Sequence, residues 1–493
     1  MDAVEAARKL LDSDVWELLP REAAEPIRGV MVLLLEELRE KAAEVERLRR
    51  RVAELEERLA RHSGNSSQPP SLDPPAVKAR RRQKGREGGG GRRGGQPGHP
   101  RWQRALLPEE QVQELERFWP EQCERCGGRE LERLDKGEGI EPRRRQVWDV
   151  EIKPKVTEYQ AYASRCVGCG HVSWASFPAE ACTVVGPTLL AWYTYLRAEA
   201  GLSLRGVQEL WREMCRVEVS LGFLKKLERQ LERALEGVYG ALEREVQERA
   251  VVYGVDETHY GDRTAWVVAT ESVTLYRLAA SRRRAEAEAL APADGGAVIV
   301  TDRYGGYDYY PSRRRQLCWA HLKRDFQAIA ERDGESGAIG ADLLQSVEAL
   351  MHWWGRYREG RLKHATLVSY IKQHVKPLVR AALERGAVCE HKATRGTCRH
   401  VLQRWDALWT FLRYEGVPIT NNASERALRR VVIHRKITYG VRSEQGARFL
   451  ERAFSVCATC RQNGKAVFRF LCDYLEAFLK GLTLPSPLAF DTS

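Results

Sequence analysis

Residues 63–105 constrain the fold most strongly, because this segment cannot take part in a hydrophobic core. It begins "SGNSSQPPSLDPP" and continues through "RRRQKGREGGGGRRGGQPGHP", so proline, glycine, serine and charge replace apolar side chains. A segment with so few apolar residues cannot bury enough surface to offset the entropy lost on folding. We therefore predict a flexible linker, with separate folded domains on either side of it.

The linker also carries most of the chain's excess charge. Between Lys78 and Arg104 there are ten Lys and Arg residues and one acid, Glu87, which is a net +9 out of +12 for the whole chain. Release of counterions favours binding of such a segment to DNA phosphates, whereas the alternative is a linker that only aids solubility. The candidate DNA-binding residues here are Arg80, Arg81, Arg82, Lys84, Arg92 and Arg93.

Residues 1–62 are predicted to form an N-terminal helix and a coiled coil. Between positions 34 and 59, two columns of residues recur every seven positions, and seven of the eight members are apolar. The a column is Leu38, Val45, Val52 and Leu59, and the d column is Leu34, Lys41, Leu48 and Leu55. Valine at a with leucine at d favours a parallel dimer, and a lysine in the seam could fix the register. The alternative is an amphipathic helix that packs on its own domain.

Membrane and secretion signals are missing from the sequence. No apolar run approaches the ~20 residues that span a bilayer, and the N-terminal "MDAVEAARKLLDSDVWELL" has acids where a signal peptide has a basic start. We therefore expect a cytoplasmic, nucleoid-associated protein. Twelve cysteines in 493 residues do not make a disulfide framework. In a reducing compartment, paired CxxC motifs are more often metal ligands.

Two CxxC motifs predict a DNA-binding zinc ribbon over residues 106–180. Each two-residue spacer lets both thiolates reach one Zn²⁺, and the glycine after each motif permits the turn that it needs. The residues between the motifs alternate as strands do, and the alternative is four free thiols. The four predicted ligands are Cys123, Cys126, Cys166 and Cys169.

The rest of the chain predicts a multidomain α/β protein. Residues 183–248 read as helices, either with a helix-turn-helix or as a plain bundle. Residues 249–328 contain the short β-rich runs "VVYGVDE", "TAWVVATE", "VTLYRLAAS" and "AVIVTDRYGGY", which predict a mixed sheet with helices on its faces. Residues 329–414 are helical and Trp-rich, as in an insertion, and residues 415–493 complete the core and add C-terminal helices.

Three acids are candidates for chemistry. Asp256 and Asp302 each follow an apolar strand, and acids at strand ends commonly face ligands or metals. Each also has a simpler explanation, because Asp256 could cap a turn and Asp302 could make an Asx-turn. Glu425 could belong to a capping box with Asn422 and pair with Arg429.

The order of motifs along nearly the whole chain resembles the transposases of the insertion sequence 66 family. The shared pieces include "SGNSSQPPS", "GGQPGHP", the double CxxC, "GVDET", "TDRYGGY", "CWAHLKRDF", "TNNASERALR" and "CRQNGKAVFRFL". "TNNASERALR" and "CWAH" are the most specific of them. The chain departs from the usual family pattern at Val255, His259 and Arg303, which leaves the three acids in place.

The resemblance implies a DDE transposase with an RNase H-like catalytic core, interrupted by the helical insertion and preceded by the coil, ribbon and helical domain. It implies that Asp256, Asp302 and Glu425 are the catalytic acids. Three carboxylates can hold two Mg²⁺ or Mn²⁺ ions ~3.5 to 4 Å apart, which suits cleavage at element ends and strand transfer. The expected partners are double-stranded DNA and a second copy, as a homodimer or higher assembly.

Several further residues near these acids have open interpretations. Cys318 and His321 are predicted to support the metal-binding acids or to pack beside them, with half a metal site as the alternative. A basic run after Glu425 could hold the DNA backbone or form a solvated face. The run comprises Arg426, Arg429, Arg430, Arg435 and Lys436. Two other functions remain open: a domesticated or inactive DNA-binding protein, and an RNase H-like nuclease that does not transpose.

Overall fold

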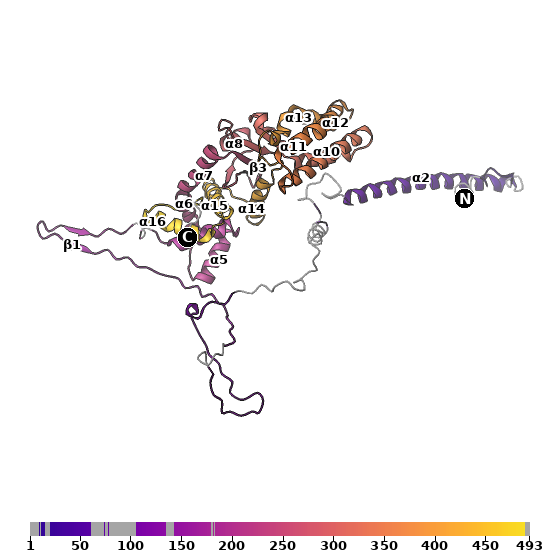
Figure 1. Ribbon diagram of the computed structural model, residues 1–493. Helices are drawn as coiled ribbons and strands as arrows, with labels where there is room; N and C mark the ends of the chain where they lie inside the picture. The colour runs from indigo at the N-terminus through magenta and orange to yellow at the C-terminus, as the bar shows by residue number, and fades with distance from the viewer. Residues whose placement is uncertain are drawn as a thin grey trace. The chain divides into compact units, whose positions relative to one another are not determined.

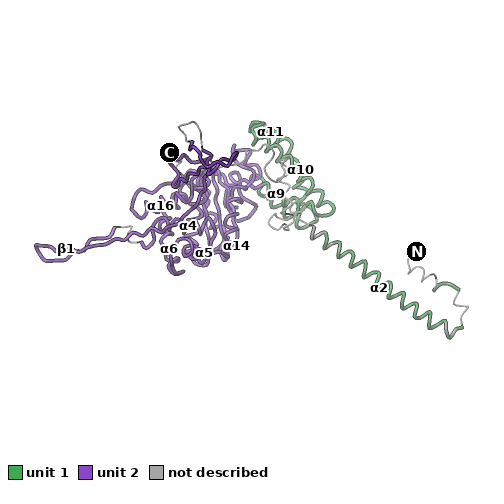
Figure 2. Tube along the Cα trace, turned by 90° about the horizontal axis from the view of Figure 1, so that it is seen from below, with its two compact units in different colours: residues 1–85, 319–405 green, residues 86–318, 406–493 purple. Residues whose placement is uncertain are grey.

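The computed structural model describes residues 20–60, 105–134, 142–178 and 183–488, with residues 9, 11–14, 73, 77 and 181. The six basic candidates between Arg80 and Arg93 lie outside the described residues. The chain divides into two compact units, which are coloured separately in Figure 2. The first unit comprises residues 1–85 and 319–405, and the second comprises 86–318 and 406–493.

A five-stranded mixed sheet forms the centre of the second unit, in the order β5-β4-β3-β6-β7. The first three strands form an antiparallel meander, whereas β6 runs parallel to β3 and β7 runs parallel to β6. The expected mixed sheet is confirmed. The strands are β3 (Val252–Tyr260), β4 (Arg263–Ala269), β5 (Thr274–Ala279), β6 (Val298–Thr301) and β7 (Arg315–Leu317).

Three C-terminal helices pack with this sheet and with the helices before it. The second of them, α15, also satisfies the outer edge of β5: the amides of Thr274, Tyr276 and Leu278 donate to side chains of α15. Because unpaired strand edges invite aggregation, this helix protects the sheet while burying its own apolar face. The helices are α14 (Asn422–Thr438), α15 (Glu444–Gln462) and α16 (Val467–Lys480).

The expected helices of residues 183–248 are also present. Ser203 and Ser220 cap two of them by accepting backbone N–H groups, and Pro187 occupies the first helical position of another. Their buried side chains join one core with the sheet, α15 and α16. The helix-turn-helix interpretation stays a prediction. The helices are α4 (Pro187–Ala198), α5 (Leu204–Cys215), α6 (Leu221–Ala234) and α7 (Glu236–Arg249), and α8 (Arg284–Leu290) precedes β6.

The first unit contains the helical segment that follows β7. Trp353 stacks on Tyr370 with ring centroids 3.7 Å apart, beside a π-helical turn. Helices were expected over residues 329–414, and this helical segment begins earlier, with α9; its interpretation as an insertion stays a prediction. Its helices are α9 (Trp319–Ala330), α10 (Gly334–Arg358), α11 (His364–Tyr370), the π-turn (Ile371–Val375), α12 (Lys376–Val388) and α13 (Lys392–Gln403).

The N-terminal α2 is one continuous helix, Arg21–Ala60, and is labelled in Figure 1. It contains the predicted heptads, and its described apolar seam residues between positions 34 and 55 are 42–52% exposed. An apolar stripe of this length is normally covered by a partner helix. No helix in the described part of the chain is both long enough and apolar enough to cross a bilayer.

We expect the isolated segment 20–62 to form a dimer at micromolar concentration, because pairing would cover the exposed seam. Val45→Asp with Val52→Asp should return it to a monomer, since each charge would be buried against the partner. The matched control is Glu46→Asp, outside the seam. Sedimentation equilibrium measures the association state of the parent segment and of each variant. A monomeric parent segment would contradict the coiled-coil interpretation.

Candidate active site

The register of the sheet brings Asp256 and Asp302 side by side. Strand β3 pairs in parallel with β6 so that Gly254 lies opposite Val300. Asp256 and Asp302 each lie two residues farther along the sequence from this pair. Neighbouring strands are ~4.8 Å apart, and equivalent positions point to the same face. The 46-residue separation of these acids equals the register offset between the two strands, so the carboxylates share one face.

Helix α14 carries Glu425 in its first turn, and Asn421 fixes where that helix begins. The side-chain amide of Asn421 donates to the carbonyl of Val255 at 2.7 Å, and its backbone N–H donates to Cys318 Sγ at 3.2 Å. Asn421 is buried and therefore ties the start of α14 to β3 and to the end of β7. Glu425 follows four residues later, and its N–H donates to the Asn421 carbonyl.

Gly254 allows this close approach. A Cβ atom at residue 254 would lie 2.4 Å from Asn421 Oδ1 and 2.4 Å from Ser424 Oγ, well inside contact distance. Both side chains are buried against the strand. The absence of a side chain at Gly254 thus lets the first turn of α14 lie directly on β3, next to Asp256.

Asp256 is close enough to the other two acids for their charges to act on it. Burial raises the pKa of Asp256 well above its ordinary value, and the negative charges of Glu257, Asp302 and Glu425 raise it further. Neither Asp256 nor Asp302 has an ion-pair partner among the described residues. Two carboxylates without an ion-pair partner, close to further acids, are an unfavourable arrangement that a divalent cation would stabilise.

Two local expectations for these acids were wrong. Asp256 lies in the middle of β3 and does not end the strand, which continues to Tyr260 because its pairing with β4 persists through that residue. Glu425 is not in a capping box with Asn422. The helix cap is Asn421, whose side-chain amide donates to the carbonyl of Val255 and whose Oδ1 accepts no capping hydrogen bond.

The turn expected at Asp302 is present and compatible with a ligand role. The amide of Tyr304 donates to Asp302 Oδ1 at 2.9 Å, and the amide of Glu257 donates to Asp256 Oδ1 at 2.9 Å. Each carboxylate thereby has one oxygen oriented by the backbone. In the described part of the chain, the other oxygen accepts no hydrogen bond.

Arg315 holds the loop that carries Asp302. Its guanidinium is buried and donates to Thr301 Oγ1 at 2.9 Å and to the carbonyls of Asp302 and Tyr304 at 3.0 and 3.1 Å. It also pairs with Asp308 at 2.7 Å. The fan of donors on a guanidinium can satisfy several acceptors at once. Sequence reasoning missed this residue, because no local pattern links it to the acid.

Glu257 is a further acid that sequence reasoning passed over. It forms an ion pair with Arg282 and accepts a hydrogen bond from the hydroxyl of Tyr307. Burial raises its pKa, and the Asp302 charge adds to that effect. Because Glu257 already has two partners, it differs from the unpaired Asp256 beside it. Its position directly after Asp256 was the signal available in the sequence.

Cys318 lies beside the acids, as a positioning residue would. Its Sγ is within 4.8 Å of a carboxylate oxygen of Glu425 and accepts the Asn421 N–H. Its own N–H donates to the Thr301 carbonyl, which extends the β6–β7 pairing. His321 is half-buried in the first turn of α9, which belongs to the other unit. That both residues orient the acids or pack beside them stays a prediction.

The basic residues after Glu425 do not act alike. Arg430 pairs with Glu199 at 2.7 Å, whereas Arg435 donates to Thr258 Oγ1 at 3.2 Å and to the carbonyl of His259. These two arginines therefore have contacts within the fold. By contrast, Arg426, Arg429 and Lys436 are exposed and make no ion pair in the described part of the chain.

The donors at Asp256, Asp302 and Glu425 fit a hard divalent cation. Carboxylate oxygens are the ligands that Mg²⁺ and Mn²⁺ prefer. The nearby sulfur of Cys318 already accepts a backbone hydrogen bond. The two aspartates keep free oxygens, and the mutual repulsion at Asp256 is the property that such a cation relieves.

Each CxxC motif forms the expected knuckle turn. Gly127 and Gly170, which follow the second cysteines, both have φ of 74°, a conformation that glycine adopts without strain. Within each knuckle the thiols interact: backbone N–H groups lower the pKa of Cys123 and Cys166, and the paired thiol lowers each further. Thiolates are the form that binds Zn²⁺.

The two knuckles remain two separate thiol pairs in the described residues and do not form one four-sulfur cluster. The alternating stretch at 143–165 was expected to form strands, but only its last three residues do, as the first strand of a short hairpin. Its strands are β1 (Ala163–Arg165) and β2 (Val172–Trp174). Val147, Val150 and Val156 are each more than 80% exposed, so the segment has almost no core to hold longer strands. Small domains of this kind depend on metal for their stability.

We expect the full chain to contain one Zn²⁺, bound by all four cysteines. Cys126→Ser and Cys169→Ser should each remove it, because a closed tetrahedral site needs four ligands. Cys472→Ser on α16 serves as the control. Elemental analysis after gentle purification measures the zinc, and a parent protein without zinc would overturn the assignment.

Comparison with known proteins adds independent evidence. A profile described as a family of unknown function (DUF6444) matches residues 19–105. Two relatives come from Sinorhizobium fredii (strain NBRC 101917 / NGR234). "Uncharacterized protein y4qI" is 26% identical over 46% of this chain, and the match spans 43% of that protein. "Uncharacterized protein y4hP" is 25% identical over 72% of this chain and 70% of its own length.

The profile of the Transposase IS66 family matches residues 183–449, more than half of the 493 residues. This range includes the whole five-stranded sheet, the helical segment after β7 and α14, and hence all three candidate acids. The chain therefore belongs to the IS66 family of transposases.

Proposed function

We propose that the chain is a DNA transposase that cleaves at the ends of its element and joins them to target DNA by two-metal-ion transesterification. The convergence of Asp256, Asp302 and Glu425 carries the proposal, because these acids come from distant segments and repel one another without a cation. The sheet order, with an antiparallel meander followed by two parallel strands, supports an RNase H-like core.

Asp256, Asp302 and Glu425 would hold two Mg²⁺ or Mn²⁺ ions. When bound, these ions supply activation of a water or DNA 3′-hydroxyl and stabilisation of the leaving 3′-oxygen at an in-line phosphate. The protein's own contribution is to fix the acids before DNA arrives. Asn421 and Gly254 set the position of Glu425, and Arg315 sets the loop after Asp302.

Double-stranded DNA and a second copy of the chain are the proposed partners. The exposed seam of α2 supports a homodimer, which would bring two element ends together. The paired thiols support a structural Zn²⁺ in a DNA-binding ribbon, and the one-sided charge of the linker supports further phosphate contacts.

A strand-transfer assay tests the proposed function. DNA from both sides of the gene, where inverted repeats are expected, is labelled and incubated with Mg²⁺ and a target plasmid. Covalent joining of label to plasmid is expected. Release of label without joining would favour a nuclease, and specific binding without any product would favour an inactive DNA-binding protein.

A further inference from the structure

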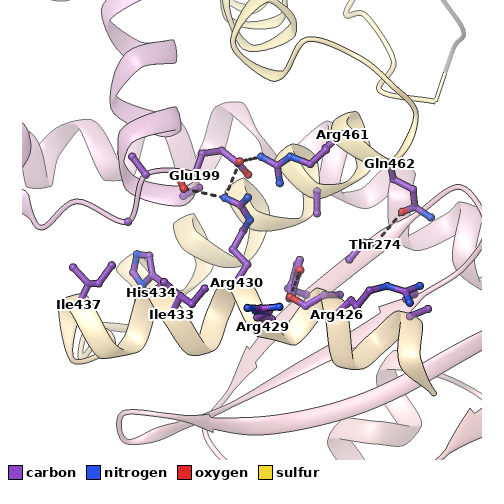
Figure 3. Close-up of a pocket in the computed structure, with 18 of the residues that line it drawn as sticks. Glu199, Thr274, Arg426, Arg429, Arg430, Ile433, His434, Ile437, Arg461 and Gln462 are labelled. Carbon is purple, nitrogen blue, oxygen red and sulfur yellow. Dashed lines mark hydrogen bonds and ion pairs between the residues drawn. The ribbon is translucent and has the colours of Figure 1, made fainter. Parts of the chain in front are cut away.

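A groove of about 600 Å³ lies beside α14, and α4, β4, β5 and α15 complete its walls. Four arginines line it, and Figure 3 shows them on α14 and α15. Glu199 is the single acid in the lining, so the groove has a net charge of +3, four positive minus one negative. The neighbouring His434 adds no charge at neutral pH, because burial lowers its pKa to about 4. The arginines are Arg426, Arg429, Arg430 and Arg461.

Glu199 contacts two of the four arginines and not the other two. Its carboxylate is only 3% exposed and binds both Arg430, at 2.7 Å, and Arg461, as the dashed lines of Figure 3 show. Arg430 also donates to the Glu199 carbonyl at 2.9 Å. Since a buried carboxylate needs such partners, Arg430 and Arg461 form a fixed base of the groove.

Arg426 and Arg429 are the other pair. Both are exposed, and neither makes an ion pair or hydrogen bond with any described residue. Guanidinium groups bind phosphate oxygens through two parallel hydrogen bonds, so two unpaired guanidinium groups beside a positive base form an anion site.

The position of the groove indicates which anion it takes. Arg429 is four residues after Glu425 and therefore lies on the same side of α14, one turn farther along. At the other end of the groove, Ile433 and Ile437 are 50% and 53% exposed, which gives the basic surface an apolar continuation. A sugar-phosphate backbone presents both charged and less polar surface, whereas a free phosphate ion presents only charge.

We propose that this groove binds the DNA sugar-phosphate backbone, with Arg426 and Arg429 contacting phosphates while Glu199 holds Arg430 and Arg461 in place. The inference rests on the proposed function for the identity of the polymer. It assigns to α14 two separate tasks: presenting Glu425 to the reacting phosphate and holding the backbone beside it.

The test compares full-length Arg426→Gln/Arg429→Gln with the parent in binding a fluorescent 30-base-pair duplex without divalent cations, as salt concentration is varied. Each lost phosphate contact removes ~0.9 from the slope of log K against log salt. We therefore expect a slope smaller by roughly 1 to 2 and an affinity about tenfold lower at ~100 mM salt. The Arg426→Lys/Arg429→Lys variant should recover most of the slope.

The matched control is Arg469→Gln/Lys480→Gln, which removes two exposed positive charges from α16. A groove variant with the same slope as this control would overturn the proposal. A second result would also overturn it: inorganic phosphate raises the melting temperature of the parent but not of the groove variant, while both bind the duplex equally. That pattern indicates a site for small anions. The assay measures DNA binding and not cleavage, so its result does not depend on whether the three acids are catalytic. Melting curves test whether the groove variant and the control variant are folded.

Discussion

Asp256→Asn, Asp302→Asn and Glu425→Gln are each expected to lower cleavage and strand transfer by roughly a thousandfold or more, with DNA binding close to that of the parent. Each change removes one negative ligand from a site where three acids would share two cations. Binding persists because affinity comes mainly from contacts of Lys and Arg to phosphates. Gel assays of cleavage and binding on the same preparations separate the two properties.

Stability provides a second readout for Asp256. Its pKa in the fold is raised above its unfolded value, so the folded state binds more protons, and stability falls as pH rises from near ~3.9 towards the raised pKa. At neutral pH without divalent cations, the charged carboxylate is therefore unfavourable. Asp256→Asn should raise the melting temperature under these conditions.

With Mg²⁺ present, the parent should become more stable than Asp256→Asn. The parent gains stability by binding the ion, about 2.7 kcal/mol when its concentration is 100 times Kd, and the variant should gain much less. Asp262→Asn, in the exposed turn after β3, is the matched control and should behave as the parent does. Normal cleavage by Glu425→Gln would remove Glu425 from the catalytic set, and a Mg²⁺ response unchanged in Asp256→Asn would remove Asp256.

Gly254→Ala is expected to have the second-largest effect, lowering both activity and stability. The new methyl group would meet Asn421 Oδ1 and Ser424 Oγ at 2.4 Å and push the start of α14 away from β3. Overpacking of this kind costs roughly 1–3 kcal/mol. Because Glu425 moves with the helix, cleavage should fall more steeply than the loss of folded protein explains. Chemical denaturation and the cleavage assay measure the two effects.

A double variant identifies the cause. Adding Ser424→Ala to Gly254→Ala removes one of the two clashing oxygens, so part of the lost stability and activity should return. Gly240→Ala on α7 is the control, since its new methyl group would be 3.7 Å from the nearest atom, an ordinary contact. Equal effects at Gly240 and Gly254 would show that glycine matters there only through backbone entropy.

Local pattern predicted much of the architecture. The heptads of α2, the helices after residue 186 and the strands β3 to β6 follow from periodicity and from the proline, glycine and serine that bound them. The acids Asp256 and Asp302 were also visible, because each follows a run of apolar β-formers. The resemblance of motif order to a known family then pointed to Glu425, which local rules had assigned to a helix cap.

Tertiary packing decided how those acids meet. Asn421 bonds to Val255 across 166 residues, and this contact overrode the capping box that the local sequence favoured. The clamp of Arg315 on the Asp302 loop and the pairing of Arg430 with Glu199 likewise join segments with no common periodicity. The physical reason is that periodicity reports which face of an element is apolar, whereas a polar side chain takes the partner that the folded chain brings within hydrogen-bonding distance.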